Sequence, residues 1–181
     1  DKETGSELDI NNKYIMSPKD LKTIHFINKM MDAGVQVFKI EGRARGAEYV
    51  KTVVSCYKDA ISSYVNGTFT EDKIVEWDKQ LATVFNRGFW NGYYLGQRLG
   101  EWSSNYGSQA TKRKVYIGKI TNYFKKINVA ECLMETQDLK LGDEILITGE
   151  TTGAYIATID ELRMDDSPVQ AVVKADVFSI K

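Results

Sequence analysis

The segment VQVFKIEGRARG, residues 35–46, decides how the fold is interpreted. Residues 35–40 form a short, nearly continuous apolar run rich in β-branched side chains, which predicts a strand buried on both faces. A charged loop follows, and functional sites in α/β sheets form beyond the C-terminal ends of strands. Lys39, Glu41 and Arg43 are therefore candidates to line a site. The alternative is a solvated network of ion pairs on the same loop.

Helical patterns lie on both sides of this segment. Ser17 and the proline after it are typical of a helix start, apolar residues recur at helical spacing over 48–66, and Thr70 can cap a third helix. A strand buried on both faces needs neighbouring strands for its N–H and C=O groups, and none is predicted nearby. Either residues 1–110 are the tail of a larger α/β domain, or residues 35–40 form an edge strand or an extended link in an α-helical subdomain.

The hydrophobic period changes near residue 110. An aromatic-rich stretch at 87–106, with glycines four residues apart, is interpreted as a loop. From residue 114 onward, apolar residues alternate with a period of two, and turn signals separate five or six short runs. Short strands with no helix between them predict a small antiparallel β-barrel over residues 111–181. The predicted fold class is therefore α+β, with a helical segment at 1–110 followed by the barrel.

The charge of the whole chain is close to neutral. Its 181 residues include 24 Lys and Arg against 25 Asp and Glu, a net charge of −1. This balance argues against a protein coated in basic charge for nucleic acid, although a local basic patch remains open. The candidates for contact with a phosphate backbone are Arg87, Lys112, Arg113, Lys114, Lys125 and Lys126.

The few histidines and cysteines limit the metal chemistry of the chain. One His and two Cys cannot build a Cys/His structural zinc site, so we expect neither a metal nor a cofactor in this chain. His25, Cys56 and Cys132 are interpreted as core or boundary residues and not as catalytic groups. No apolar run approaches the roughly 18 residues that a membrane span needs, so a membrane partner is not expected.

Several short motifs, taken in order, resemble the collagenase-like peptidases of family U32. They are SPKDL at 17–21, FKIEGR at 38–43, EYV at 48–50 and NRGF at 86–89. The resemblance implies that residues 1–110 are the last part of a TIM-type barrel that carries the active site. It also implies a peptidase or, as in some members of the family, an enzyme of tRNA or rRNA hydroxylation.

The resemblance carries further expectations about this chain. The chain should be a C-terminal portion, inactive alone, with a barrel that binds RNA or a protein, in a cytoplasmic parent protein. Its partners should include the upstream part of the parent domain, and self-association through residues 35–40 is a further possibility. RNA-modifying relatives carry a cysteine ligand of an iron–sulfur cluster where Lys22 stands here, so the sequence departs from the cluster-binding pattern.

Overall fold

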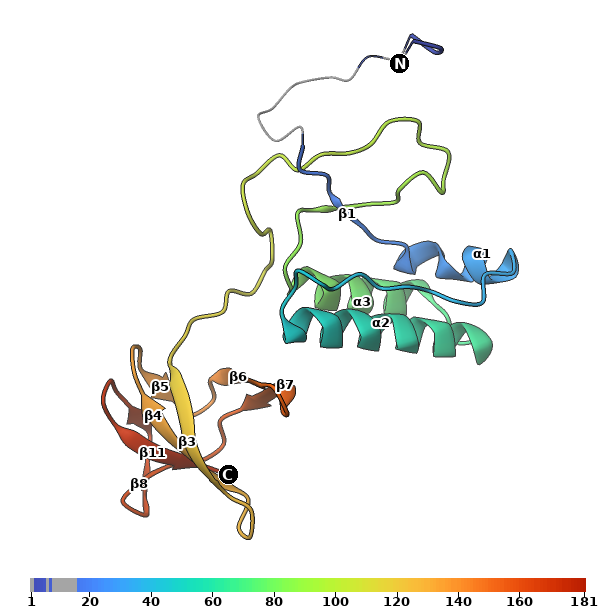
Figure 1. Cartoon of the computed structure of the whole chain (residues 1–181). Coiled ribbons are helices and arrows are strands. Elements are labelled where there is room, and N and C mark those ends of the chain that lie inside the picture. The colour runs from blue at the N-terminus through green and yellow to red at the C-terminus, as the bar shows by residue number, and fades with distance from the viewer. Residues whose placement is uncertain (1, 6, 8–15) are drawn as a thin grey trace. The chain divides into compact units, whose positions relative to one another are not determined.

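The computed structural model describes residues 2–5, 7 and 16–181. They form two compact units, one ending at Lys112 and the other spanning Arg113–Lys181 (Figure 1). Each unit has its own hydrophobic core. The first unit is mainly helical and the second consists of short strands, so the α+β class is confirmed.

Three helices build the core of the first unit. A 3₁₀ turn at Ile24–Phe26 leads into α1 (Ile27–Asp32), while α2 (Ala47–Val65) and α3 (Glu71–Ala82) pack side by side (Figure 1). The predicted cap of α3 is confirmed, because the Thr70 hydroxyl accepts the backbone N–H three residues on. The buried side chains of this core are Ile24, Ile27, Val53, Cys56, Ala60, Ile74, Trp77, Leu81 and Val84.

The helix start predicted at Ser17 is wrong, because this stretch is extended. Strand β1 (Asp20–Leu21) pairs in parallel with β2 (Phe89–Trp90), and Pro18 forms an isolated bridge with Trp102. The aromatic-rich segment, which is irregular apart from β2, thus supplies backbone partners to residues 17–22. Partners from a distant segment outweigh the local preference of a Ser-Pro pair for a helix start.

Residues 35–40 do not form the predicted strand. They are extended but pair with no strand in the part of the chain that the structure describes. Phe38 and Ile40 are half-buried against the helical core, whereas Val37 is 84% exposed. The segment is therefore an extended link along the helices. The physical reason is that the described residues offer its N–H and C=O groups no neighbouring strand.

A single carboxylate ties three segments of the first unit together. Asp20 Oδ1 accepts hydrogen bonds from Arg45 Nη2 at 2.9 Å and from Arg87 Nη2 at 3.1 Å. Its Oδ2 accepts the backbone N–H of Arg87 at 2.8 Å. The Arg45 guanidinium also lies over the Phe85 ring, 4.1 Å from its centroid. Asp20 thus fixes the end of the charged loop against β1 and the chain after α3.

The second unit is made of short antiparallel strands. One sheet has the order β3-β4-β11-β8-β9, with β3 (Gly118–Phe124) at one edge and β4 (Val129–Met134) beside it. The hairpin of β6 (Glu144–Gly149) and β7 (Gly153–Thr158) forms a separate two-stranded sheet. The other strands are β5 (Leu139–Lys140), β8 (Leu162–Met164), β9 (Ser167–Val169), β10 (Ala171–Val172) and β11 (Val177–Ile180).

The predicted barrel is wrong in its closure. Among the described strands, β3 pairs only with β4, and β6 and β7 pair only with each other. The register between β3 and β4 shifts between Ile120 and Asn122, which interrupts the ladder at a bulge. The sheets therefore leave an open side next to β3, although the predicted run of short antiparallel strands is confirmed.

We expect the two cores to respond separately to the loss of a large side chain. Trp77 is 3% exposed in the first core and Leu162 is 1% exposed in the second. Trp77→Ala and Leu162→Ala should each destabilise their own unit by about 2–5 kcal/mol, because each leaves a cavity. Hydrogen exchange of segments 47–82 and 129–180 measures both units at once. A loss of protection in both units for one substitution would contradict separate cores.

Asp20→Asn should destabilise the first unit by about 1–3 kcal/mol, because two guanidinium groups lose their shared negative charge. Urea unfolding followed by tryptophan fluorescence measures this, since all 3 tryptophans precede residue 113. Glu41→Gln is the matched control, because it removes an exposed charge from the loop and should change stability by less than about 0.5 kcal/mol. If the two substitutions changed the free energy of unfolding equally, Asp20 would not have the structural role described here.

Candidate functional site

The charged loop places its three predicted site residues in solvent. Lys39, Glu41 and Arg43 are all exposed. Glu41 Oε1 accepts the backbone N–H of Arg43 at 2.9 Å, which stabilises the turn locally. The link between the loop and the rest of the unit comes from Arg45, whose partner Asp20 is 25 residues away. No local sequence signal could have identified that pair.

The predicted phosphate-binding residues divide between the two units. Arg87 belongs to the first unit, where its guanidinium group contacts Asp20 and its side chain is 31% exposed. Lys112 is the last residue of that unit, and the other four lie in the second. Lys125 and Lys126 occupy the exposed turn between β3 and β4. The structure thus gathers two of the six candidates on one hairpin tip and gives Arg87 an ion pair.

The thiols of this chain are poorly suited to nucleophilic attack. Burial, with a further contribution from Asp59, raises the pKa of the Cys56 thiol to about 11. Burial likewise raises the pKa of Cys132 to about 11. Because the thiolate is the reactive form, both residues are weak nucleophiles at neutral pH.

The single histidine has a structural environment. Partial burial and the nearby Lys22 ammonium lower the pKa of His25, so its imidazole is mainly neutral at pH 7. Its ring packs edge-on against Phe26, with 4.8 Å between the centroids. Residues 2–5, 7 and 16–181 contain no cluster of three or more His, Cys, Asp or Glu side chains arranged to hold a metal ion.

Lys22, which the resemblance places where RNA-modifying relatives carry a cluster cysteine, forms an ion pair. Lys22 Nζ lies 2.7 Å from Asp78 Oδ1 and 4.6 Å from the centroid of the Phe89 ring. An ammonium group has no lone pair to offer iron, whereas such clusters are held by cysteine thiolates. Lys22 therefore does not fit the ligand set of an iron–sulfur cluster.

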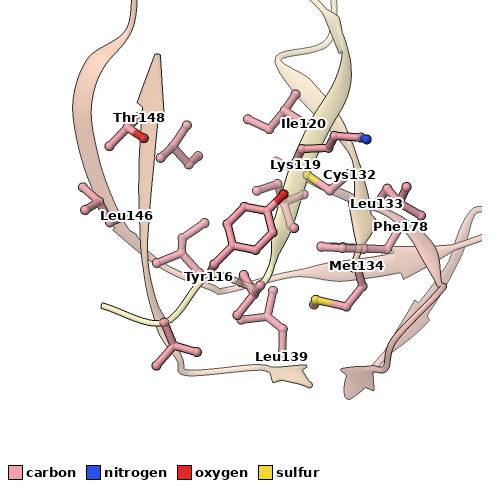
Figure 2. A pocket seen from close by; sticks show the side chains of 16 residues that line it. Tyr116, Lys119, Ile120, Cys132, Leu133, Met134, Leu139, Leu146, Thr148 and Phe178 are labelled. Carbon is pink, nitrogen blue, oxygen red and sulfur yellow. The ribbon is translucent and has the colours of Figure 1, made fainter. Parts of the chain in front are cut away.

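The second unit contains a cavity of about 410 Å³. It lies between the β6–β7 hairpin and the larger sheet, and it is bounded by backbone segments 115–120 and 145–148 (Figure 2). Its lining is mostly aliphatic, with Cys132 and Met134 of β4 on the sheet side and Leu146 on the hairpin side. The sequence did not predict this cavity, because these residues belong to alternating apolar runs that are equally typical of a filled core.

Two polar side chains, Tyr116 and Lys119, belong to the cavity lining. The Tyr116 hydroxyl donates a hydrogen bond to Glu135, and Lys119 Nζ lies 2.8 Å from Glu135 Oε1. The hydrogen bonds from Lys119 and Tyr116 lower the pKa of Glu135, and the contact with Glu135 raises the pKa of Lys119. Glu135 thus links the two polar residues of an otherwise mainly apolar lining.

No helix in the described ranges combines the length and the apolar character that a membrane span would require.

Comparison with known proteins gives a consistent set of relatives. The chain is 63% identical over 180 residues to "Collagenase" of Porphyromonas gingivalis, which covers 99% of this chain and 44% of that protein. It is 35% identical over 178 residues to an uncharacterized protease of Methanocaldococcus jannaschii, covering 97% of this chain and 43% of that protein. It is 32% identical over 156 residues to tRNA hydroxylation protein P1 of Bacillus subtilis, covering 84% and 36%.

The chain spans about half the length of the curated collagenases that it matches. A model described as peptidase family U32 matches residues 1–104, which is more than half of the chain. The motifs at 17–21, 38–43, 48–50 and 86–89 all lie within that match. The resemblance seen in these motifs is confirmed, and the chain belongs to peptidase family U32.

Proposed function

We propose that this chain is part of a collagenase-like peptidase, in which it supports the active site and binds a partner. The observation that carries the proposal is 63% identity over nearly the whole chain to a protein named collagenase. Catalysis would be a property of the longer protein, with the first unit joined to its upstream part. The second unit would then act as an accessory binding unit.

The charged loop is the part of the first unit that we place at the active site. Glu41 is an exposed carboxylate between two exposed cations, Lys39 and Arg43. Such a group can act as a general acid or base, or orient a substrate amide. The Asp20–Arg45 contact supports this role because it holds the end of the loop, while Lys39, Glu41 and Arg43 remain exposed.

Residues 35–40 are the segment through which we join the first unit to the rest of the longer protein. Phe38 and Ile40 face the helices, while Val35 and Val37 are exposed on an extended backbone. A neighbouring strand from the same protein would cover these valines and supply hydrogen-bond partners. Pairing with a second copy of the chain is the competing arrangement.

An RNA-modifying enzyme is the second candidate function. The observation that favours it is 32% identity to a tRNA hydroxylation protein over most of this chain. The exposed cations at the β3–β4 turn would then contact phosphates. A cytoplasmic location belongs to this proposal, because the substrate would be a cellular RNA.

The test is hydrolysis of labelled gelatin by the longer gene product that contains this sequence. We expect cleavage by that product and none by the 181-residue chain alone. Glu41→Gln in the longer product should lower kcat/KM about 10²-fold or more if the carboxylate transfers a proton. Release of fluorescent fragments measures this activity.

Glu150→Gln is the matched control, because Glu150 is an exposed carboxylate in the turn between β6 and β7. It should leave kcat/KM unchanged. Unchanged activity in Glu41→Gln would remove Glu41 from the site. Loss of tRNA hydroxylation in cells that lack the gene, without any gelatin cleavage by the product, would favour the RNA-modifying function.

A further inference from the structure

We propose that the open side of the second unit binds an extended acidic–apolar polypeptide segment, which adds as a strand to the edge of β3. This inference rests on the accessory role proposed above and names its ligand class. Its test measures binding by this chain and not hydrolysis, so the two proposals can fail separately.

The first observation is the position of β3 at the edge of its sheet. Within the described strands it pairs only with β4, so its other side presents a row of backbone N–H and C=O groups. The bulge after Ile120 interrupts the regular ladder beyond that residue. The regular edge of β3 before the bulge is therefore short and covers Gly118–Ile120. Residues 115–117, which lead into it, line the cavity.

The second observation is that the cavity lies directly against this edge. Residues 115–120 form one wall and residues 145–148 of β6 form the other, and β6 pairs only with β7 in the described part of the sheet system (Figure 2). Ile120 is 41% exposed although its partner across the ladder, Cys132, is 7% exposed. A strand inserted here would cover Ile120 and fill an apolar space of about 410 Å³.

The third observation is a separation of charge along the second unit. Residues 113–130, which include β3 and its turn, carry five cations and no acidic residue. Residues 131–181 carry four cations and 11 acidic residues. The two lysines of the turn, Lys125 and Lys126, are exposed at the end of β3. Lys119, on the edge itself, is paired with Glu135, so the exposed positive charge that favours an acidic partner lies at the β3–β4 turn.

These features favour a polypeptide over RNA. Single-stranded RNA binds on several exposed aromatic faces. Of the two aromatic residues that line the cavity, Tyr116 is 60% exposed and hydrogen-bonded to Glu135, and Phe178 is 5% exposed. The rest of the lining is mainly aliphatic. Strand addition instead uses main-chain hydrogen bonds for affinity and apolar pockets for alternate side chains. An edge beside an aliphatic cavity offers both.

The probe is a fluorescein-labelled peptide of alternating valine and glutamate, titrated into the 181-residue chain at low salt. We expect saturable anisotropy changes and NMR shifts in the amides of 115–120 and 145–148. Methylation of alternate peptide nitrogens should weaken binding about tenfold or more, because it removes the main-chain donors. Added salt should weaken binding as well, since exposed charges are screened.

Ile120→Thr should weaken binding about tenfold, because it replaces exposed apolar surface in the lining of the cavity. Ile156→Thr is the matched control: Ile156 is 42% exposed, lies on β7 and does not line the cavity. It should leave affinity unchanged. Ile120→Ala is a second variant that separates lost contact from misfolding, with the amide spectrum as the check on folding.

Three results would overturn the proposal. The first is no binding of the peptide at about 1 mM in low salt. The second is equal affinity of the methylated peptide, which would exclude strand addition. The third is saturable binding of a single-stranded RNA oligomer along residues 115–120 in the absence of peptide binding, which would assign the edge to nucleic acid.

Discussion

The need of extended backbone for hydrogen-bond partners governs both units of this protein. In the first unit, β1 meets that need with β2, from nearly 70 residues further along the chain. Residues 35–40 are just as extended but have no strand beside them in the described part of the chain. In the second unit, β4 has a partner on each side and β3 on only one. The surfaces to which we assign binding lie where this pairing stops.

Local patterns predicted the elements whose stability is local. Helices α2 and α3 follow from apolar spacing, and the Thr70 cap follows from a side chain three residues from its donor. The strand-rich second unit follows from a change of period. The start of the first helix could not be predicted, because residues 17–22 bond to a distant segment. The prediction of a closed barrel was wrong for a related reason. Closure depends on whether β3 pairs with β6, and the alternation of apolar residues along each strand does not determine which strands pair.

The candidate site was predictable in the charge of its residues but not in their contacts. The loop after residue 40 is exposed and charged, and its location could be read from its residues. The ion pairs of Asp20 with Arg45 and Arg87 could not be predicted, because these arginines lie 25 and 67 positions from Asp20 in the sequence. The cavity in the second unit is harder still, since side chains from separate strands create it together. Membership of family U32 explains the motifs, while the structure adds where their side chains point.

The burial of the two cysteines has a consequence for the surroundings in which the protein can work. Cys56 lies in the core of the first unit and Cys132 in the core of the second, so each thiol is enclosed by its own packing. Oxidation and disulfide exchange both proceed through an accessible thiolate. Burial therefore disfavours both reactions in the folded chain. The folded form of this chain thus shields both of its thiols from redox chemistry in its surroundings.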